Sequence, residues 1–201
     1  MFLLNGIIKH DGNIEVLNNQ DLTILKGNVK QEIIPHFSLD EMKYLLSLVP
    51  LDKRGMLFNF LWRTGVRVSE CISIKKSFID FDNDEISIRW LKNRKAHYRV
   101  IPLHYSLKNP LYMFCSGFKA DQFVFPISRQ RVFQLCQKWG FNNPHKIRHS
   151  FAINFIRQND NPSALFELQK LLGHSDINTT MIYLKVVPSD LKKSVNKIRF
   201  D

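Results

Sequence analysis

The sequence predicts a mainly α-helical fold with one small antiparallel β-sheet, an α+β architecture. Apolar residues recur at helical spacing from residue 37 onward. One stretch, residues 85–103, breaks this pattern, because polar and apolar residues alternate there as they do in a half-buried strand. With 201 residues, of which 44% are hydrophobic and 23% charged, the chain has the size and composition of one globular domain.

Helices are expected on both sides of this sheet. Ser38 followed by Glu41 has the spacing of a capping box at the start of the first helix. Gly65 suits the left-handed C-terminal position of the second helix. The expected helical segments are residues 38–49, 52–63, 66–75, 128–139, 145–158, 163–172, 177–184 and 189–198, most of them separated by glycine or proline. The last of them is amphipathic and too short to be stable without docking on something.

The sheet is expected to have two or three strands. Residues 85–90 and 98–103 form its two alternating segments, and residues 78–82 supply a possible third strand. The turn between the two main strands, residues 92–96, is polar and basic. This turn could be a solvated hairpin tip or a basic finger that reaches a phosphate.

Residues 1–36 differ from the rest, because short apolar pairs alternate there with Gly, Asn and Asp. They are interpreted as an N-terminal arm or a few short strands, and residues 37–201 as the main domain. No secretory leader or membrane-spanning run is expected, so the predicted location is cytoplasmic. The three cysteines are far apart in sequence and are interpreted as core residues, with no disulfide framework and no metal knuckle.

The charge indicates a polyanionic partner. The formal net charge is +11, from 29 basic and 18 acidic residues. Residues 1–36 hold three of those basic residues and four of the acidic ones, so the whole positive excess lies in the main domain. Nucleic acid is the first candidate for a domain this basic, although an uncommitted basic surface would have the same composition.

Several basic or nucleophilic side chains stand at helix starts and turns. A cation at position 67 opposes the dipole of the following helix, so Arg67 either holds an anion or pairs with Glu70 three residues on. His145 and Arg148 are three residues apart on a helix and can address one ligand. His149 is interpreted as a structural histidine that points elsewhere.

Two further residues follow near the end of the domain. Gly173 ends a helix and presents His174 on a tight turn, where it is either functional or a hydrogen-bonded structural residue. Tyr183 lies in a mostly apolar setting, and a single tyrosine of this kind usually packs in a core.

Taken together, these residues resemble the tyrosine recombinase (phage integrase) family. The similar strings are Thr64–Glu70 (TGVRVSE), His145–Ala152 (HKIRHSFA) and Leu172–Ser175 (LGHS), continued through Thr179 and Thr180 to Tyr183. The hairpin segments Arg89–Asn93 and Val100–Leu103 are similar to the family's lysine-bearing hairpin. The resemblance covers about residues 37–198 and implies the catalytic-domain fold of that family.

The resemblance implies site-specific cleavage and rejoining of DNA through a 3′-phosphotyrosyl intermediate, without metal, cofactor or small-molecule substrate. The implied catalytic residues are Arg67, Lys92, His145, Arg148, His174 and the nucleophile Tyr183. The implied roles are phosphate binding by the two arginines and His174, protonation of the leaving oxygen by Lys92, and assistance in proton transfer by His145. DNA-binding residues are expected at Arg94, Lys95, Arg99 and Lys146, and Lys95 is a second candidate for the role of Lys92.

The expected partner is double-stranded DNA with inverted-repeat sites. The protein is expected to be a monomer or weak oligomer when free and a homo-tetramer on paired sites, in the nucleoid of a prokaryote or encoded by a virus or plasmid. Because residues 1–36 are too few for a second helical domain, a compact, catalytic-domain-only member is expected. Alternatives are a type IB topoisomerase-like enzyme, a non-catalytic DNA-binding regulator on the same fold, and a metal-dependent nuclease, for which the sequence shows no ligand cluster.

Overall fold

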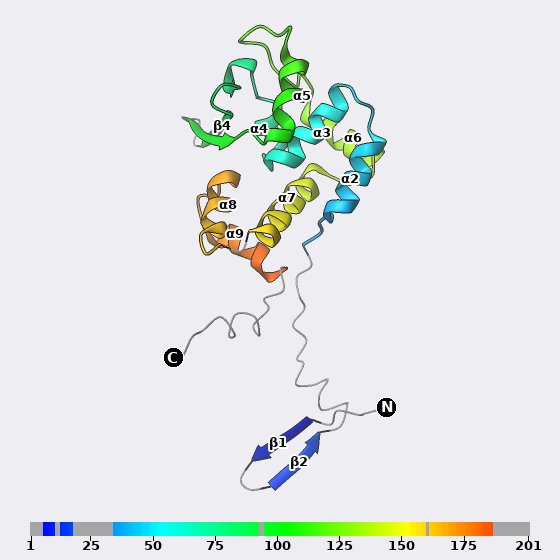
Figure 1. Ribbon diagram of the computed structural model, residues 1–201, viewed down its shortest axis with the longest axis vertical. Helices are drawn as coiled ribbons and strands as arrows, with labels where there is room; N and C mark the ends of the chain where they lie inside the picture. The colour runs from blue at the N-terminus through cyan, green and yellow to red at the C-terminus, as the bar shows by residue number, and fades with distance from the viewer. Residues whose placement is uncertain (1–5, 11–12, 18–33, 93–94, 160, 187–201) are drawn as a thin grey trace. The chain divides into compact units, whose positions relative to one another are not determined.

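The computed structural model describes residues 6–10, 13–17, 34–92, 95–159 and 161–186 (Figure 1). The chain divides into two compact units, residues 1–32 and 33–201. In the first unit, strands β1 (Gly6–His10) and β2 (Asn13–Leu17) pair in an antiparallel ladder. The expected helix at residues 189–198 lies outside the described residues.

The second unit is mostly helical, which confirms the predicted fold class. Its helices are α2 (Leu39–Leu48), α3 (Lys53–Thr64), α4 (Val68–Cys71), α5 (Tyr105–Cys115), α6 (Arg129–Lys138), α7 (Pro144–Gln158), α8 (Ala164–Leu172) and α9 (Asn178–Met181), with 3₁₀ turns η1 (Lys76–Phe78) and η2 (Ile182–Lys185). The first helix starts with the predicted capping box, in which Glu41 accepts a hydrogen bond from the amide of Ser38 and Ser38 accepts one from the amide of Glu41.

One antiparallel sheet of three strands, β3 (Ile79–Asp80), β4 (Glu85–Lys92) and β5 (Lys95–Pro102), lies in this unit in that order. The β4–β5 hairpin pairs Glu85 with Pro102 at its base and Lys92 with Lys95 at its tip. Ile86, Ile88 and Ile101 are buried at the base, whereas residues 95–98 are exposed. The hairpin is therefore anchored at one end and projects at the other.

Helix α7 joins two hydrophobic clusters. The first contains Phe58 and Ile147 and gathers α2–α6 with the sheet, and the second contains Ile153 and Tyr183 and gathers α7, α8 and η2. Burial of each large apolar side chain of this kind contributes about 1.5–3 kcal/mol. Since α7 supplies residues to both clusters, it fixes how the sheet side of the domain lies against α8 (Figure 1).

The start of the second unit is tied to the same helix. The amide of Phe37 donates to Ser150 Oγ at 2.7 Å, and Asn154 Nδ2 donates to the carbonyl of Phe37 at 3.1 Å. Ser150 and Asn154 are one turn apart on α7 and both are buried. A buried polar side chain is stabilising only when it is hydrogen-bonded, and these two are satisfied by the entering chain.

Helix α5 differs from the expectation, because the sequence pattern gave no helix between residues 104 and 127. His104 caps its start by accepting from the amide of Ser106, and Pro110 sits inside it. Proline removes one helical donor and usually ends a helix, which is why the pattern did not predict α5. Its apolar side, Leu107 and Leu111, is buried in the first cluster and outweighs that loss.

Helix α4 is shorter than predicted, ending at Cys71 where we expected Lys75. The Ser73 hydroxyl donates to the carbonyl of Glu70 at 2.8 Å, which ends the helix. The Ile74 carbonyl then accepts from the amide of Val124, a distant segment. This backbone hydrogen bond between distant segments replaces the next helical turn. In the expected segment 177–184, helix α9 likewise tightens into the 3₁₀ turn η2.

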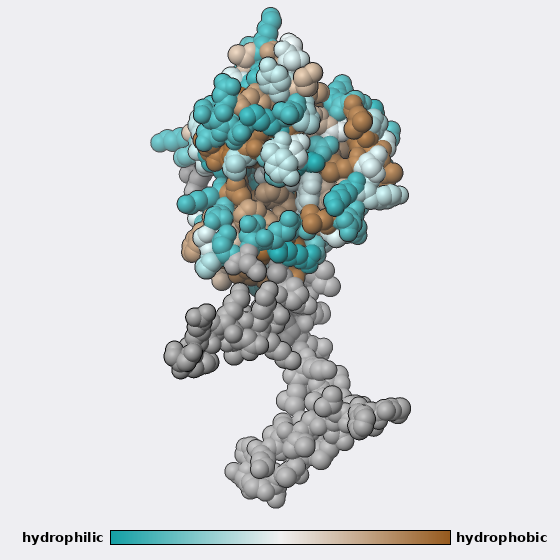
Figure 2. Space-filling view, viewed as in Figure 1, coloured by the Kyte–Doolittle hydropathy of each residue, from teal (hydrophilic) through white to brown (hydrophobic). Residues whose placement is uncertain are grey.

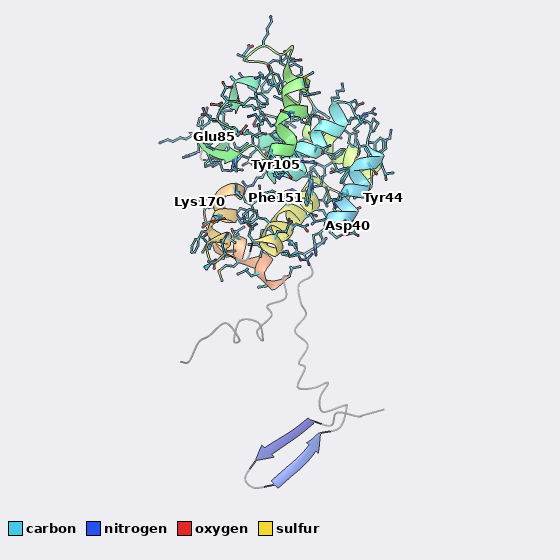
Figure 3. The ribbon with its side chains drawn as sticks, viewed as in Figure 1. Asp40, Tyr44, Glu85, Tyr105, Phe151 and Lys170 are labelled. Atoms are coloured by element: carbon cyan, nitrogen blue, oxygen red, sulfur yellow. The ribbon has the colours of Figure 1, made fainter. Side chains whose placement is uncertain are left out.

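The described surface is largely hydrophilic in the view of Figure 2. Figure 3 shows the described side chains, with Glu85 on the sheet and Lys170 on α8 labelled on two separate elements. Among the described residues no helix is both long and apolar enough to cross a membrane.

The three cysteines are buried and unpaired, as expected from the sequence. Burial raises the pKa of the Cys115 thiol to about 11 and that of Cys136 to about 12. Each thiol therefore stays protonated near neutral pH and behaves as a small apolar core group.

We predict that Gly65→Ala destabilises the domain by about 1–3 kcal/mol. Gly65 caps α3 in the left-handed region at φ 62°, and a Cβ there would overlap the ring of Phe151. Thermal denaturation measures the loss. The matched control is Gly117→Ala, where a Cβ meets nothing within 4 Å, and its effect should stay within about 0.5 kcal/mol. Equal melting temperatures for the two variants would contradict the prediction.

Candidate active site

The guanidinium of Arg148 lies at the centre of the candidate site. It projects from the first half of α7 and is 6% exposed. Its Nη1 donates to the carbonyl of Gly65 at 2.8 Å, and its Nη2 donates to the carbonyl of Leu172 and to His174 Nε2, both at 2.9 Å. Burial and the charge of Arg67 lower the pKa of Arg148 to about 10, so it remains a cation at neutral pH.

Arg67 stands immediately before α4, on the sheet side of the site. Its Nη1 lies 3.2 Å from Glu70 Oε1 and 3.4 Å from the carbonyl of Leu172, the carbonyl that Arg148 also uses. The Arg67 side chain is 40% exposed. The pairing with Glu70 that the sequence suggested is therefore present, and part of the Arg67 side chain remains open to the pocket.

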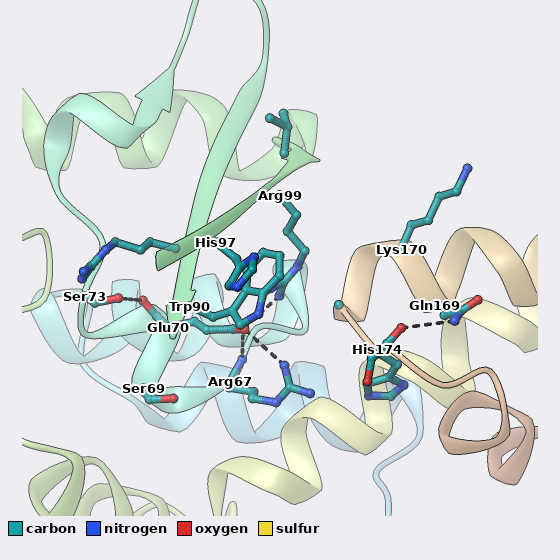
Figure 4. Close-up of a pocket in the computed structure, with 14 residues that line it drawn as sticks. Arg67, Ser69, Glu70, Ser73, Trp90, His97, Arg99, Gln169, Lys170 and His174 are labelled. Atoms are coloured by element: carbon teal, nitrogen blue, oxygen red, sulfur yellow. Dashed lines mark hydrogen bonds and ion pairs between the residues drawn. The ribbon is translucent and has the colours of Figure 1, made fainter. Parts of the chain in front are cut away.

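Glu70 and Arg99 form a buried ion pair beside Arg67 (Figure 4). Arg99 Nη1 and Nη2 donate to the two carboxylate oxygens of Glu70 at 2.8 and 2.9 Å, and Arg99 Nε donates to the carbonyl of Leu171. Burial raises the pKa of Glu70, but the hydrogen bonds and charge of Arg99, and then those of Arg67, hold its pKa below the ordinary value. Glu70 is thus ionised and orients two arginines.

The sequence analysis placed Arg99 among DNA-contacting residues, and its geometry differs from that expectation. Its side chain is 10% exposed, and a Cβ on Gly173 would come within 2.7 Å of Arg99 Nη1. The guanidinium is therefore enclosed between α4 and the end of α8. The bidentate contact with a buried carboxylate and the bond to the Leu171 carbonyl use three of its five N–H donors, so its main observed contacts are within the protein. No signal in the sequence indicated this pair, because Glu70 and Arg99 are 29 residues apart and meet only through the fold.

His174 follows Gly173, whose φ of 65° is the left-handed turn that ends α8. His174 Nε2 accepts from Arg148, because a guanidinium can only donate. Its Nδ1, 2.9 Å from the hydroxyl of Thr180, then carries the proton of a neutral ring. Burial, followed by the charges of Arg148, Arg67 and Arg99, lowers the pKa of His174 to about 4. The imidazole is uncharged in this state.

Tyr183 lies on η2 and is 2% exposed. Its ring packs in the second hydrophobic cluster, and its Oη lies 3.1 Å from His149 Nδ1. Burial raises the pKa of Tyr183, while the positive charges of Arg148 and Arg67 act in the opposite direction. The hydroxyl is therefore protonated at neutral pH and lies within the electrostatic reach of both arginines.

The contact between Tyr183 and His149 corrects the sequence interpretation of His149. We expected that histidine to point away from the site, because only the spacing of His145 and Arg148 was considered. Residues four apart on a helix are neighbours as well, so His149 shares a face with His145. His145 itself is exposed beside Phe133, with ring centroids 6.3 Å apart, and burial and nearby arginine charges lower its pKa.

The hairpin residues lie on the other side of the site. Lys92 and Lys95 pair at its tip, and Lys95 is exposed. In the ladder, the pair formed by Lys92 and Lys95 lies two steps beyond the pair formed by Trp90 and His97. Arg94 lies outside the described residues. Lys146, expected to contact DNA, places its Nζ over the ring of Phe37, 3.7 Å from the centroid.

A pocket of about 940 Å³ separates the hairpin from α8 (Figure 4). The residues that line it include Arg67, Arg89, Trp90, His97, Lys170 and His174. Glu70 is the acid among its lining residues, and Arg99 and Arg67 neutralise it. In the part of the chain that the structure describes, no three His, Cys, Asp or Glu side chains are grouped so as to hold a metal ion. The pocket suits an anion held by cationic donors.

Comparison with known proteins identifies the family. The model of the phage integrase family matches residues 36–189, which is most of the chain. The chain belongs to this family. The resemblance seen in the sequence is therefore confirmed, and the cationic pocket lies within the region that the family model matches.

Among relatives in the family, the tyrosine recombinase XerA of Thermococcus onnurineus is 32% identical over 80% of this chain and 61% of its own length. XerA of Thermococcus kodakarensis is 30% identical over 92% of this chain and 70% of its own length. XerA of Saccharolobus solfataricus is matched over only 56% of its length. The chain thus spans between 56% and 70% of the length of these relatives.

Solved structures share the fold. A crystal structure of XerA recombinase has a TM-score of 0.64 at 24% identity, over 84% of this chain and 67% of that chain. The catalytic domain of the bacteriophage HP1 integrase has a TM-score of 0.60 at 20% identity, over 82% of this chain and 95% of that domain. The predicted tyrosine recombinase catalytic-domain fold is therefore confirmed.

We predict that His174 titrates near pH 4 in the free protein and that its pKa rises when an anion such as sulfate binds beside it. The folded-state pKa of about 4 lies below the ordinary value of 6.5, so the unfolded chain binds the proton first. The contribution of His174 to stability is therefore lost as pH falls from 6.5 towards 4. Titration of the imidazole by NMR, with and without sulfate, measures both effects. A His174 pKa near 6.5 that is the same with and without sulfate would contradict the neutral imidazole hydrogen-bonded to Arg148.

Proposed function

We propose that this chain is a site-specific DNA recombinase that cleaves and rejoins strands through a covalent 3′-phosphotyrosyl link on Tyr183. The observation that carries this proposal is the convergence of Arg67, Arg148 and His174 beside the hydroxyl-bearing residue Tyr183. Family membership supports it, and so do structural neighbours that were solved with DNA, such as XerH bound to its difH substrate and the Tn1549 integrase in complex with circular intermediate DNA.

In the cleavage step, Tyr183 Oη forms a bond to phosphorus and the bond from phosphorus to the 5′-oxygen breaks. The phosphate sits where Arg148 and Arg67 place cationic N–H donors, so that the charge developing on its non-bridging oxygens is stabilised. Phosphoryl transfer depends mainly on positioning and electrostatics, which a cationic pocket supplies. In the proposal, Arg99 holds Glu70 in place, and Glu70 in turn orients Arg67.

His174 has to change partners when the phosphate arrives. Its Nε2 accepts from Arg148 in the present state, and a phosphate oxygen would compete for that Arg148 donor. A proton gained at Nε2 then makes His174 a donor to the phosphate. The hydrogen bond from Nδ1 to Thr180 keeps the ring in place during this exchange.

The leaving 5′-oxygen needs a proton, and we assign its delivery to Lys92 of the hairpin, with Lys95 as the alternative. The covalent link conserves the energy of the broken bond, so a 5′-hydroxyl of a partner strand can reverse the step. We further propose that the protein is a monomer or weak oligomer when free. It would form a homo-tetramer on paired DNA sites that contain inverted repeats. Residues 189–198 would link protomers in that assembly.

We predict that Tyr183→Phe abolishes covalent attachment to a nicked suicide duplex while DNA binding stays nearly unchanged, because the ring keeps its packing and only the nucleophilic oxygen is lost. Adduct formation is measured on denaturing gels. Tyr105→Phe is the matched control, since this tyrosine is 84% exposed and should leave adduct formation intact. A covalent adduct formed by Tyr183→Phe would contradict the assignment.

We predict that Lys92→Ala cleaves an ordinary phosphodiester slowly, by a factor of about 10²–10⁴, and recovers on a substrate whose 5′-bridging oxygen is replaced by sulfur. A thiolate leaves without protonation, so sulfur removes the need for the general acid. Single-turnover rates on the two substrates measure the recovery. Lys95→Ala is the paired variant. If Lys95→Ala recovers on the sulfur substrate and Lys92→Ala does not, Lys95 is the general acid.

A further inference from the structure

We propose that the imidazole of His149 accepts the phenolic proton of Tyr183 as that oxygen attacks phosphorus. This inference rests on the proposed function and adds a catalytic residue to it. The geometry points to His149 because its Nδ1 lies 3.1 Å from Tyr183 Oη, within hydrogen-bonding distance of the reacting atom.

The contact is built into the packing of two elements. His149 lies in the middle of α7, and Tyr183 lies on η2, which packs against that helix. The two rings are tilted at 54° with centroids 5.8 Å apart, and Nδ1 and Oη are 3.1 Å apart. The Tyr183 ring is fixed in the second hydrophobic cluster, which leaves its hydroxyl aimed at His149.

The charge state of His149 suits a proton acceptor. The titratable or charged groups around it are His145 and Arg148 on α7 and Tyr183 on η2, and η2 also carries Lys185. Burial lowers the pKa of His149, and so do His145 and Arg148, which keeps its imidazole neutral near pH 7. The phenol is protonated under the same conditions, because burial raises the pKa of Tyr183. A neutral acceptor therefore faces a protonated donor.

His145 is less suited to this task. Its ring is exposed beside Phe133 and stands one helical turn away from His149. Arg148, between them in sequence, directs its guanidinium to Gly65, Leu172 and His174. Among the described residues, His149 is the one whose side chain reaches the Tyr183 hydroxyl.

The proton balance of the step is complete. The proton moves from Tyr183 Oη to His149 Nδ1 as the bond from oxygen to phosphorus forms, and the hairpin lysine gives its proton to the 5′-oxygen as that bond breaks. The bound phosphate offsets the positive charge of Arg148 and thereby makes His149 more basic at the moment of transfer. In the rejoining step the imidazolium returns its proton to the departing phenolate.

The test is the pH dependence of single-turnover adduct formation on a suicide duplex, for the full chain and for two His149 variants. His149→Asn places an amide oxygen near the position of Nδ1, so it keeps a hydrogen-bond acceptor that cannot take a proton. His149→Ala removes both functions. His36→Asn is the matched control, since His36 is a partly buried histidine whose Nδ1 contacts the carbonyl of Ile34.

We expect both His149 variants to be slower than the unmodified chain near neutral pH by a factor of about 10²–10⁴. Their rates should rise with pH up to the ionisation of the tyrosine, because the phenol then loses its proton to solvent. The unmodified chain and His36→Asn should reach a plateau at a lower pH. Thermal denaturation of each variant establishes that it is folded at the assay temperature.

Two results would overturn the inference. One is a His149→Asn rate within about threefold of the unmodified chain, which would reduce His149 to a hydrogen-bonding support. The other is a folded pair of variants slowed by the same factor at every pH, which would indicate a positioning effect alone. Both leave the proposed function intact. That function fails separately if the unmodified chain forms no adduct at all.

Discussion

The rest of the site depends on the buried guanidinium of Arg148, whose hydrogen-bond partners are two carbonyls and one imidazole. Removing a guanidinium from water costs several kcal/mol unless its donors are satisfied. Arg148 meets that requirement with two main-chain carbonyls and one imidazole, drawn from the end of α3, the end of α8 and the turn beyond it. These three segments have to converge for the domain to fold, and in converging they leave a positive field with no paired anion. The hydrogen bonds that satisfy Arg148 in the folded domain and the positive field of the site thus have one origin.

Glu70 extends that arrangement to the hairpin. By binding Arg99 of β5 with both oxygens and Arg67 with one, it connects the strand pair to α4. Among the described residues nearer the tip, positions 95–98 are exposed, so the hairpin is held at its base and projects beyond it.

The sequence predicted most helices because their caps and apolar periods are local properties. Ser38 with Glu41, and Gly65 after the second helix, illustrate this. Helix α5 was not predicted, because Pro110 argues locally against a helix that is held by distant packing. The family motifs predicted which residues belong to the site, but they did not predict which residues these side chains contact. Nothing in the spacing shows that Glu70 receives Arg99, or that His149 rather than His145 meets Tyr183, because both contacts depend on how α7 lies against η2 and how the hairpin lies against α4.

Main-chain carbonyls hold much of this site, and this has a consequence for how the sequence can change over time. The carbonyls of Gly65, Leu171 and Leu172 accept from three arginines, and no point substitution deletes a carbonyl. The identities of Leu171 and Leu172 are therefore free to drift among apolar residues of similar volume without altering the acceptors. The glycines at 65 and 173 lack that freedom, since their left-handed backbone aims the carbonyls and makes room for neighbouring side chains. The residues around these two turns can thus change while the main-chain acceptors stay in place, provided that the glycines at 65 and 173 are kept.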